Sequence, residues 1–192
     1  MMKRNDLHVS RLSVKLFLLL ALLLSSSGGL QAKATDADTL RVLAIGNSFS
    51  QDAVEQYLHE LGKSEGYIMI IGNMYIGGCS LERHVKNIRN NTPAYAYRKV
   101  DKNGKRVEIR EMTIEKALAD EPWDYVSLQQ ASPVSGIYET YKASLPELVN
   151  YVKPRVSKKT VLMMHQTWAY AGNSTHSGFK NYNSSQMKMY TD

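Results

Sequence analysis

The sequence has a single cysteine, Cys79, among 192 residues, and it has no apolar run long enough to cross a membrane. One cysteine excludes an internal disulfide framework and a zinc site built from several thiolates. No motif surrounds Cys79, so a small buried residue is favoured over a nucleophile at this position. His59 and His84 have no partner at metal-ligand spacing, and we expect neither a metal nor another cofactor.

Charge is close to balanced once the N-terminal region is set aside. The whole chain has 24 Lys and Arg against 18 Asp and Glu, which gives a net charge of +6. Residues 1–34 contribute +4 of this charge, which leaves +2 for residues 35–192. The remaining Lys and Arg form no stripe, so nucleic acid is not an expected partner.

The N-terminal region has the three parts of a secretory signal peptide. Basic residues come first, an apolar run covers Leu16–Leu24, and an Ala-Lys-Ala site ends at Ala34. A membrane-spanning helix needs about 20 apolar residues, so this run is too short to be an anchor. We expect a signal peptide over 1–34, cleaved after Ala34 or, as the second candidate, after Ala32. The mature protein would then be periplasmic or secreted, without a stable membrane span, and 35–192 would form one domain.

The mature region alternates short apolar runs with amphipathic segments. The apolar runs predict buried strands at 40–45, 67–75, 125–128 and 160–164. The amphipathic segments predict helices at 50–61, 80–88, 114–119 and 138–152, with another beginning near 186. This alternation predicts an α/β domain with a parallel sheet covered by helices on both faces.

Three segments allow sharper local predictions. Ser50 is a good N-cap for the first helix, whose inward face would hold Val54, Tyr57, Leu58 and Leu61. An Asn-Gly pair between alternating runs predicts a β-hairpin inserted near 94–112, at the rim of the domain. Residues 173–185 are polar and are expected to form a loop.

Ligands of parallel α/β sheets bind beyond the carboxyl ends of the strands. The first strand is followed there by Gly46-Asn47-Ser48-Phe49-Ser50. Ser48 would lie beside free helix N–H groups, which suits a serine nucleophile whose reaction intermediate carries an oxyanion. The same residues are equally compatible with a simple turn.

Two further strand ends could supply oxyanion donors. Gly77-Gly78 after the second strand could offer a backbone N–H, although a plain tight turn is the favoured interpretation of the pair taken alone. Gln129 and Gln130 end the third strand with side-chain amides, which is unusual for a purely structural segment. Together with Ser48, these residues predict a site for acyl transfer at one edge of the sheet.

The combination of these motifs resembles the SGNH (GDSL-like) hydrolases. The stretches LAIGNSFSQDA, IGGCSLERH, WDYVSLQQAS and HQTWAYA are similar to a subgroup known only as a domain of unknown function. The resemblance implies a flavodoxin-like three-layer α/β/α sandwich and hydrolysis of acyl esters, often acetyl groups on carbohydrates. It also implies that Ser48 is the nucleophile and that Gly78, or its neighbour Gly77, is an oxyanion donor.

The sequence departs from the family pattern in its third and fourth blocks. Gln-Gln-Ala-Ser-Pro stands where the family has Gly-x-Asn, so Gln130 or Gln129 would supply the third oxyanion donor. In the first block, Asn47 replaces the usual Asp. The Asp-x-x-His that carries the family's general base is absent. Either the C-terminal part of the domain is missing, or His165 or His176 is the base, or the domain has lost catalysis and kept a binding cleft.

The segment after the fourth strand contains His165 and Trp168 at the expected rim of the site. An exposed tryptophan face suits a sugar ring, whereas a buried one would only pack in the core. Asn47, Gln129, His165 and Trp168 are therefore candidate substrate-binding residues. The leading hypothesis is a serine esterase acting on a small-molecule or carbohydrate ester. The second is a non-catalytic glycan-binding module, and a nucleotide binder is disfavoured because a Gly-rich phosphate loop is lacking.

Overall fold

The computed structural model describes residues 38–191, and the predicted signal peptide lies outside this range. The strands are β1 (Thr39–Gly46), β2 (Ile68–Tyr75), β3 (Tyr95–Val100), β4 (Arg106–Met112), β5 (Tyr125–Gln129) and β6 (Val161–His165). The α-helices are α2 (Ser48–Ser50), α3 (Leu58–Ser64), α4 (Leu81–Arg89), α5 (Ile114–Asp120), α6 (Glu139–Lys142), α7 (Ser144–Val152) and α8 (Gln186–Thr191). Shorter turns are the π-helix η2 (Gln51–Glu55) and the 3₁₀ helices η3 (Ser132–Val134), η4 (Lys153–Arg155) and η5 (Ser177–Tyr182).

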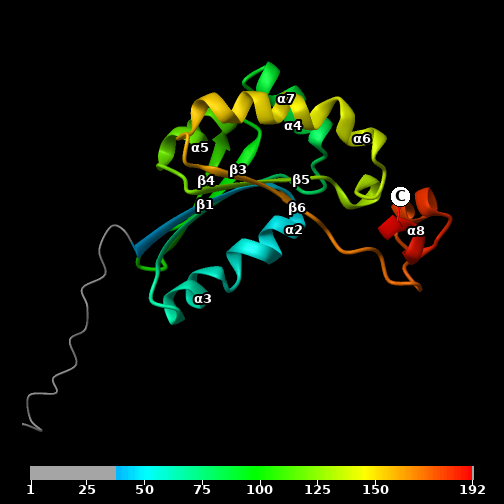
Figure 1. Cartoon of the computed structure of the whole chain (residues 1–192), viewed down its shortest axis with the longest axis horizontal. Coiled ribbons are helices and arrows are strands. Elements are labelled where there is room, and N and C mark those ends of the chain that lie inside the picture. The colour runs from blue at the N-terminus through cyan, green and yellow to red at the C-terminus, as the bar shows by residue number, and fades with distance from the viewer. Residues whose placement is uncertain (1–37, 192) are drawn as a thin grey trace, which may run out of the picture. The chain divides into compact units, whose positions relative to one another are not determined.

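The strands form one sheet in the order β4-β3-β2-β1-β5-β6. The neighbours β2, β1, β5 and β6 are parallel, and their order along the sheet is that of flavodoxin-like folds. Helices α4, α5 and α7 cover one face, and α2, η2 and α3 lie on the other (Figure 1). The predicted three-layer α/β/α architecture is therefore confirmed.

The core is divided by the sheet into two apolar clusters. The larger cluster, under α4, α5 and α7, includes Leu43, Ile45, Trp123 and Leu148, all nearly fully buried. The smaller cluster, under η2 and α3, is built around Val42 and Ala44 of β1 and Met69 and Ile71 of β2. Alternate residues of β1 thus point into different clusters, which explains why its sequence reads as a continuous apolar run.

The predicted hairpin is confirmed, and it extends the sheet. Strands β3 and β4 pair with each other, and β3 pairs antiparallel with β2, so the sheet is mixed and not wholly parallel. Asp101 stabilises the connecting turn because its carboxylate accepts hydrogen bonds from the backbone N–H groups of Asn103 and Lys105. Gly104 in the same turn has a φ of +81°, a conformation that favours glycine.

The first helical segment differs from the prediction. Its N-cap is Asn47, which accepts a hydrogen bond from the backbone of Phe49, and Ser50 lies inside the helix. The π-helix η2 then interrupts the regular α-helical repeat, so side chains beyond it are rotated relative to those before it. As a result, Val54 and Leu58 contact the core, whereas Tyr57 and Leu61 are exposed.

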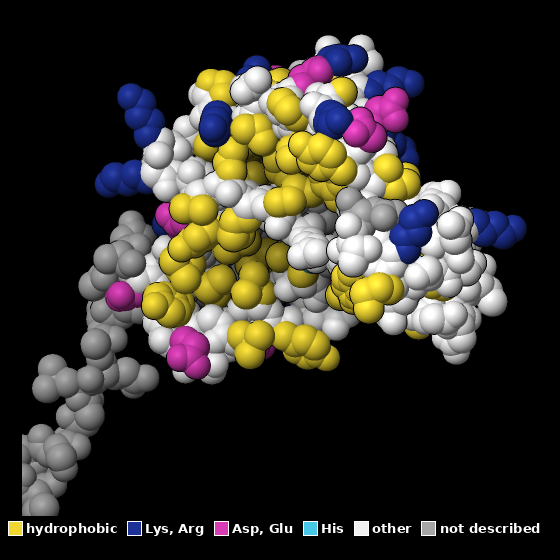
Figure 2. All heavy atoms as spheres, turned by 45° about the vertical axis from the view of Figure 1, so that its right-hand side comes forward, with side chains coloured by type: hydrophobic (Ala, Val, Ile, Leu, Met, Phe, Trp, Pro, Cys, Tyr) yellow, Lys and Arg dark blue, Asp and Glu magenta, His cyan; other side chains and the backbone are white. Residues whose placement is uncertain are grey.

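Strand β6 is at the edge of the sheet and is not covered on both faces by the described residues. Val161, Met163 and Met164 are each at least 40% exposed, which corrects the expectation that every strand would be buried. Figure 2 shows hydrophobic side chains gathered across the middle of the face that it presents. Within residues 38–191, no helix has the length and apolar character needed to span a bilayer.

The segment expected to be a polar loop over 173–185 contains structure. It includes the 3₁₀ helix η5, in which Phe179 and Tyr182 are buried against Ala169 and Met189 of the small cluster near α8. The side chain of Asn181 donates to the carbonyl of Pro133, and the Tyr182 hydroxyl accepts from the backbone N–H of Gly136. These bonds attach the C-terminal segment to the loop that follows β5.

Candidate functional site

The sheet brings the predicted strand-end segments to one edge. Gly46 at the end of β1 is in register with Tyr75 of β2, and Gln129 of β5 is in register with His165 of β6. Ser48 begins α2 directly beyond β1 and is exposed. A serine hydroxyl therefore stands in solvent at the carboxyl ends of the parallel strands, where ligands of such folds bind.

The buried side chain of Asn47 fixes the position of the turn that carries Ser48. It is 1% exposed, and its side-chain NH₂ donates to the carbonyls of Cys79 at 3.0 Å and of Gln130 at 3.4 Å. Its Oδ1 accepts from the backbone N–H of Phe49 at 3.2 Å and from Gln129 Nε2 at 2.6 Å. One buried amide thus connects the loops after β1, β2 and β5. This geometry positions the turn and gives Asn47 no contact with solvent.

Gln129 and Gln130 are also directed into the protein. Both are at most 2% exposed. Gln130 Nε2 donates to Thr140 Oγ1 at 3.1 Å, and its Oε1 accepts from the backbone N–H groups of Leu81 and Ala131. The amide nitrogen of each glutamine donates to a protein acceptor, whereas Gln129 Oε1 is buried without a hydrogen-bond partner among the described residues. The side chains of Asn47, Gln129 and Gln130 are thus buried in this structure and connect the loops around Ser48.

The Gly77-Gly78 turn is the second exposed part of the site. Gly78 has a φ of +62°, and a Cβ built on it would meet no atom within 4 Å. The following carbonyl, that of Cys79, is the one that Asn47 binds, so the turn is fixed relative to Ser48. The structure therefore brings together two of the predicted residues, Ser48 and Gly78, as exposed backbone positions linked through one side chain.

A second chain of polar groups, which local sequence patterns do not reveal, supports the turn from the side of β2. Ser50 Oγ donates to the carbonyl of Asn47 at 2.7 Å and is 2.9 Å from Asn73 Oδ1. Asn73 Nδ2 donates to Glu55, which forms an ion pair with Arg98 at 3.5 Å. Asn73 is on β2, 23 residues from Ser50 and 18 from Glu55, so it reaches them only because β2 pairs with β1.

An aromatic pair lies beside Ser48. Trp168 is 58% exposed, and its ring packs edge-on against Phe49 with the ring centroids 4.7 Å apart. Phe49 follows Ser48 directly, so this pair forms one side of the site. Trp168 is thus available to a ligand and is not a core residue.

The two histidines considered as a base occupy different environments. His165 ends β6 and is half-buried, and burial lowers its pKa, so its imidazole is neutral at pH 7 and able to accept a proton. His176 stacks on Tyr170 and accepts a hydrogen bond from Gly178 N–H through Nδ1, which caps η5. Within residues 38–191, neither histidine forms a hydrogen bond with the Ser48 hydroxyl.

Cys79 belongs to a buried polar cluster behind the Gly77-Gly78 turn. Its sulfur is 3.6 Å from His84 Nδ1, and the same nitrogen is 2.8 Å from the hydroxyl of Tyr95, which also accepts from Asn87. Burial raises the pKa of the Cys79 thiol to about 12 and lowers the pKa of His84 to about 3. Both groups are therefore neutral at pH 7, which agrees with a structural cysteine.

Among residues 38–191, no group of three or more His, Cys, Asp or Glu side chains is arranged to hold a metal ion. The family model of DUF4886, a domain of unknown function, matches residues 41–192. No match was found among curated proteins.

Two solved structures are similar to this chain. A DUF4886 family protein from Bacteroides uniformis is 77% identical, with a TM-score of 0.78 over 79% of this chain. The present chain spans 59% of the length of that protein. A candidate SGNH hydrolase from Slackia heliotrinireducens is 20% identical, with a TM-score of 0.49, over 79% of this chain and 67% of its own. The resemblance to a subgroup known as a domain of unknown function is thus confirmed.

Proposed function

This chain belongs to the DUF4886 family, and on that premise we propose that it is the part of an exported serine esterase that carries the nucleophile. The observation that carries the proposal is Ser48, exposed beyond β1 on a turn that buried Asn47 fastens to the loops after β2 and β5. A turn held in this way keeps the hydroxyl and the neighbouring N–H groups in one geometry, which acyl transfer requires.

In the proposed reaction, Ser48 Oγ attacks the carbonyl carbon of an acyl ester and its proton passes to a base. The negative charge that develops on the carbonyl oxygen is stabilised by the backbone N–H groups of Ser48 and Gly78. A single donor of this kind is worth about 10²–10³ in rate. The alcohol then leaves with the proton, and water hydrolyses the acyl-serine. Gln129 and Gln130 act only by holding the loops in position.

The general base is assigned to a histidine in a part of the full-length protein that the present sequence does not cover, since this chain spans 59% of the length of its 77% identical relative. Ser48 has no histidine partner within residues 38–191, although an unassisted serine hydroxyl is a weak nucleophile. His165 is the alternative base because it lies at the same edge of the sheet and burial keeps it neutral.

The alcohol part of the ester is assigned to a carbohydrate. The supporting observation is Trp168, whose exposed ring lies against Phe49 beside the nucleophile. An aromatic face can cover the apolar side of a sugar ring while the hydroxyl groups stay in water.

Ester hydrolysis by the natural full-length protein tests the proposal. It should release acetate from 4-nitrophenyl acetate and from acetylated xylan, and Ser48→Ala should abolish both activities. Ser64→Ala is the matched control, because this exposed serine at the end of α3 should be dispensable. Wild-type rates in Ser48→Ala would exclude the serine mechanism. The variant His165→Gln distinguishes the two candidate bases. Activity on the small ester should persist if the base lies elsewhere, and it should be lost if His165 is the base.

A glycan-binding module without catalysis is the second candidate, and the exposed Trp168 favours it. In that case the full-length protein would bind saccharides without cleaving any ester, and Trp168→Ala would weaken binding while Ser48→Ala would not.

A further inference from the structure

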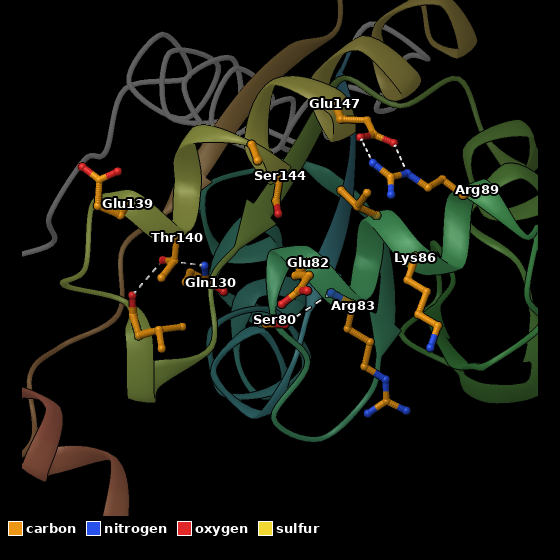
Figure 3. Close-up of a pocket in the computed structure, with 13 residues that line it drawn as sticks. Ser80, Glu82, Arg83, Lys86, Arg89, Gln130, Glu139, Thr140, Ser144 and Glu147 are labelled. Carbon is orange, nitrogen blue, oxygen red and sulfur yellow. Dashed lines mark hydrogen bonds and ion pairs between the residues drawn. The ribbon is translucent and has the colours of Figure 1, made fainter.

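A groove of about 750 Å³ lies between α4 and the helices α6 and α7, on the face of the sheet opposite α3. Its size is within the range of small-molecule binding sites. One end is lined by Ser80 and Gln130. The other end is closed by Arg89, which binds both carboxylate oxygens of Glu147 and so connects α4 to α7 (Figure 3).

The end of the groove at Ser80 and Gln130 adjoins the Ser48 site. Ser80 follows the Gly77-Gly78 turn by two residues, and the carbonyl of Gln130 accepts a hydrogen bond from Asn47. This end of the groove is therefore formed by the loops that position Ser48, although Ser48 itself does not line it. Thr140 and Ser144 line its α6 and α7 side, where the Thr140 hydroxyl accepts from Gln130 and donates to the carbonyl of Ile137.

The charges along the groove are unequal once their partners are counted. Glu147 is paired with Arg89, and Glu139 is paired with Lys142 at 2.6 Å. Within residues 38–191, Arg83 and Lys86 form no ion pair. The carboxylate of Glu82, which also lines the groove, forms none either.

Among the described residues, the groove lining therefore contains two cations and one anion that form no ion pair. Arg83 and Lys86 are three residues apart on α4, and in Figure 3 both side chains extend away from the Arg89–Glu147 pair.

We propose that this groove binds a carboxylate-bearing sugar unit of the substrate, with Arg83 and Lys86 as its anion-binding residues. The planar guanidinium of Arg83 matches a carboxylate, and Lys86 adds a second positive charge beside it. The inference deepens the proposed function, because it makes the substrate an acylated acidic glycan.

Calorimetric binding to the natural full-length protein tests the groove without requiring catalysis. Tetragalacturonate is the acidic probe and xylotetraose is the neutral one. Tetragalacturonate should bind more tightly, and its affinity should fall as NaCl is raised. The double variant Arg83→Gln/Lys86→Gln should weaken its binding about tenfold or more, since each side chain loses a charge-assisted contact. Lys63→Gln is the matched control, because this lysine is on α3, across the sheet.

The inference is overturned if xylotetraose binds as tightly as tetragalacturonate, or if the double variant binds the acid as well as wild type. Failure of the esterase proposal is recognised separately. Charge-dependent binding without ester turnover would support the anion-binding groove and contradict the esterase proposal. Ester turnover with the same kcat/KM for acetylated galacturonan in the wild type and the double variant would support the esterase proposal and contradict the anion-binding groove.

Discussion

Truncation of Asn47 to alanine should destabilise the protein more than any exposed substitution near the site. The side chain makes four hydrogen bonds, and its removal deprives the buried Gln129 amide and the carbonyls of Cys79 and Gln130 of a partner. A buried polar group left without a partner costs about 1–3 kcal/mol, and partial relaxation brings the sum for these groups to about 3–5 kcal/mol. In a domain of this size, that corresponds to a fall in Tm of about 10 °C.

Urea unfolding of the natural full-length protein, followed by circular dichroism, measures the effect. Asn173→Ala is the control, because this asparagine is exposed and should change the unfolding free energy by less than about 0.5 kcal/mol. A stability of Asn47→Ala within that same margin would refute the argument, since it would mean that Asn47 is not what fastens the three loops.

Two further predictions concern the buried cluster behind the Gly77-Gly78 turn. Burial lowers the pKa of His84 from its ordinary 6.5 to about 3, so the unfolded chain binds a proton that the folded chain does not. Stability from this group is therefore complete above pH 6.5 and is lost as the pH falls toward 3, by about 1.4 kcal/mol per pH unit. Between pH 6.5 and 5, urea titrations should show this slope in wild type and a smaller one in His84→Gln; equal slopes would contradict the assignment. Because burial raises the pKa of Cys79 to about 12, a thiol reagent at pH 8 should label it only after denaturation, and rapid labelling of the folded protein would be inconsistent with this structure.

The candidate site could be predicted only in part from the sequence. The positions of Ser48 and Gly78 follow from local patterns, because both come directly after a strand and the carboxyl ends of parallel strands meet at one edge. The directions of Gln129 and Gln130 do not follow in this way. Both residues end a strand, but their side chains turn inward because Asn47, Thr140 and Leu81 offer buried partners.

The first helix is a second case in which local sequence patterns predict only part of the structure. Its apolar residues have helical spacing, and Val54 and Leu58 do contact the core. Tyr57 and Leu61 are exposed because the π-helix η2 inserts an irregular turn that the spacing of apolar residues does not reveal. Contacts such as those of Ser50 with Asn73 are equally invisible in the sequence, since they need β2 to lie beside β1.

The sequence by itself determined the α/β class, the strand positions and the hairpin over 94–112, because apolar periodicity and the Asn-Gly turn are local signals. It also identified the edge of the sheet where Ser48 lies. Tertiary structure alone decided that β3 and β4 join the sheet, that Asn47 holds three loops together, and that Trp168 packs against Phe49. Each of these depends on residues distant in sequence whose contacts form only when strands pair and helices pack, and no local pattern encodes such contacts.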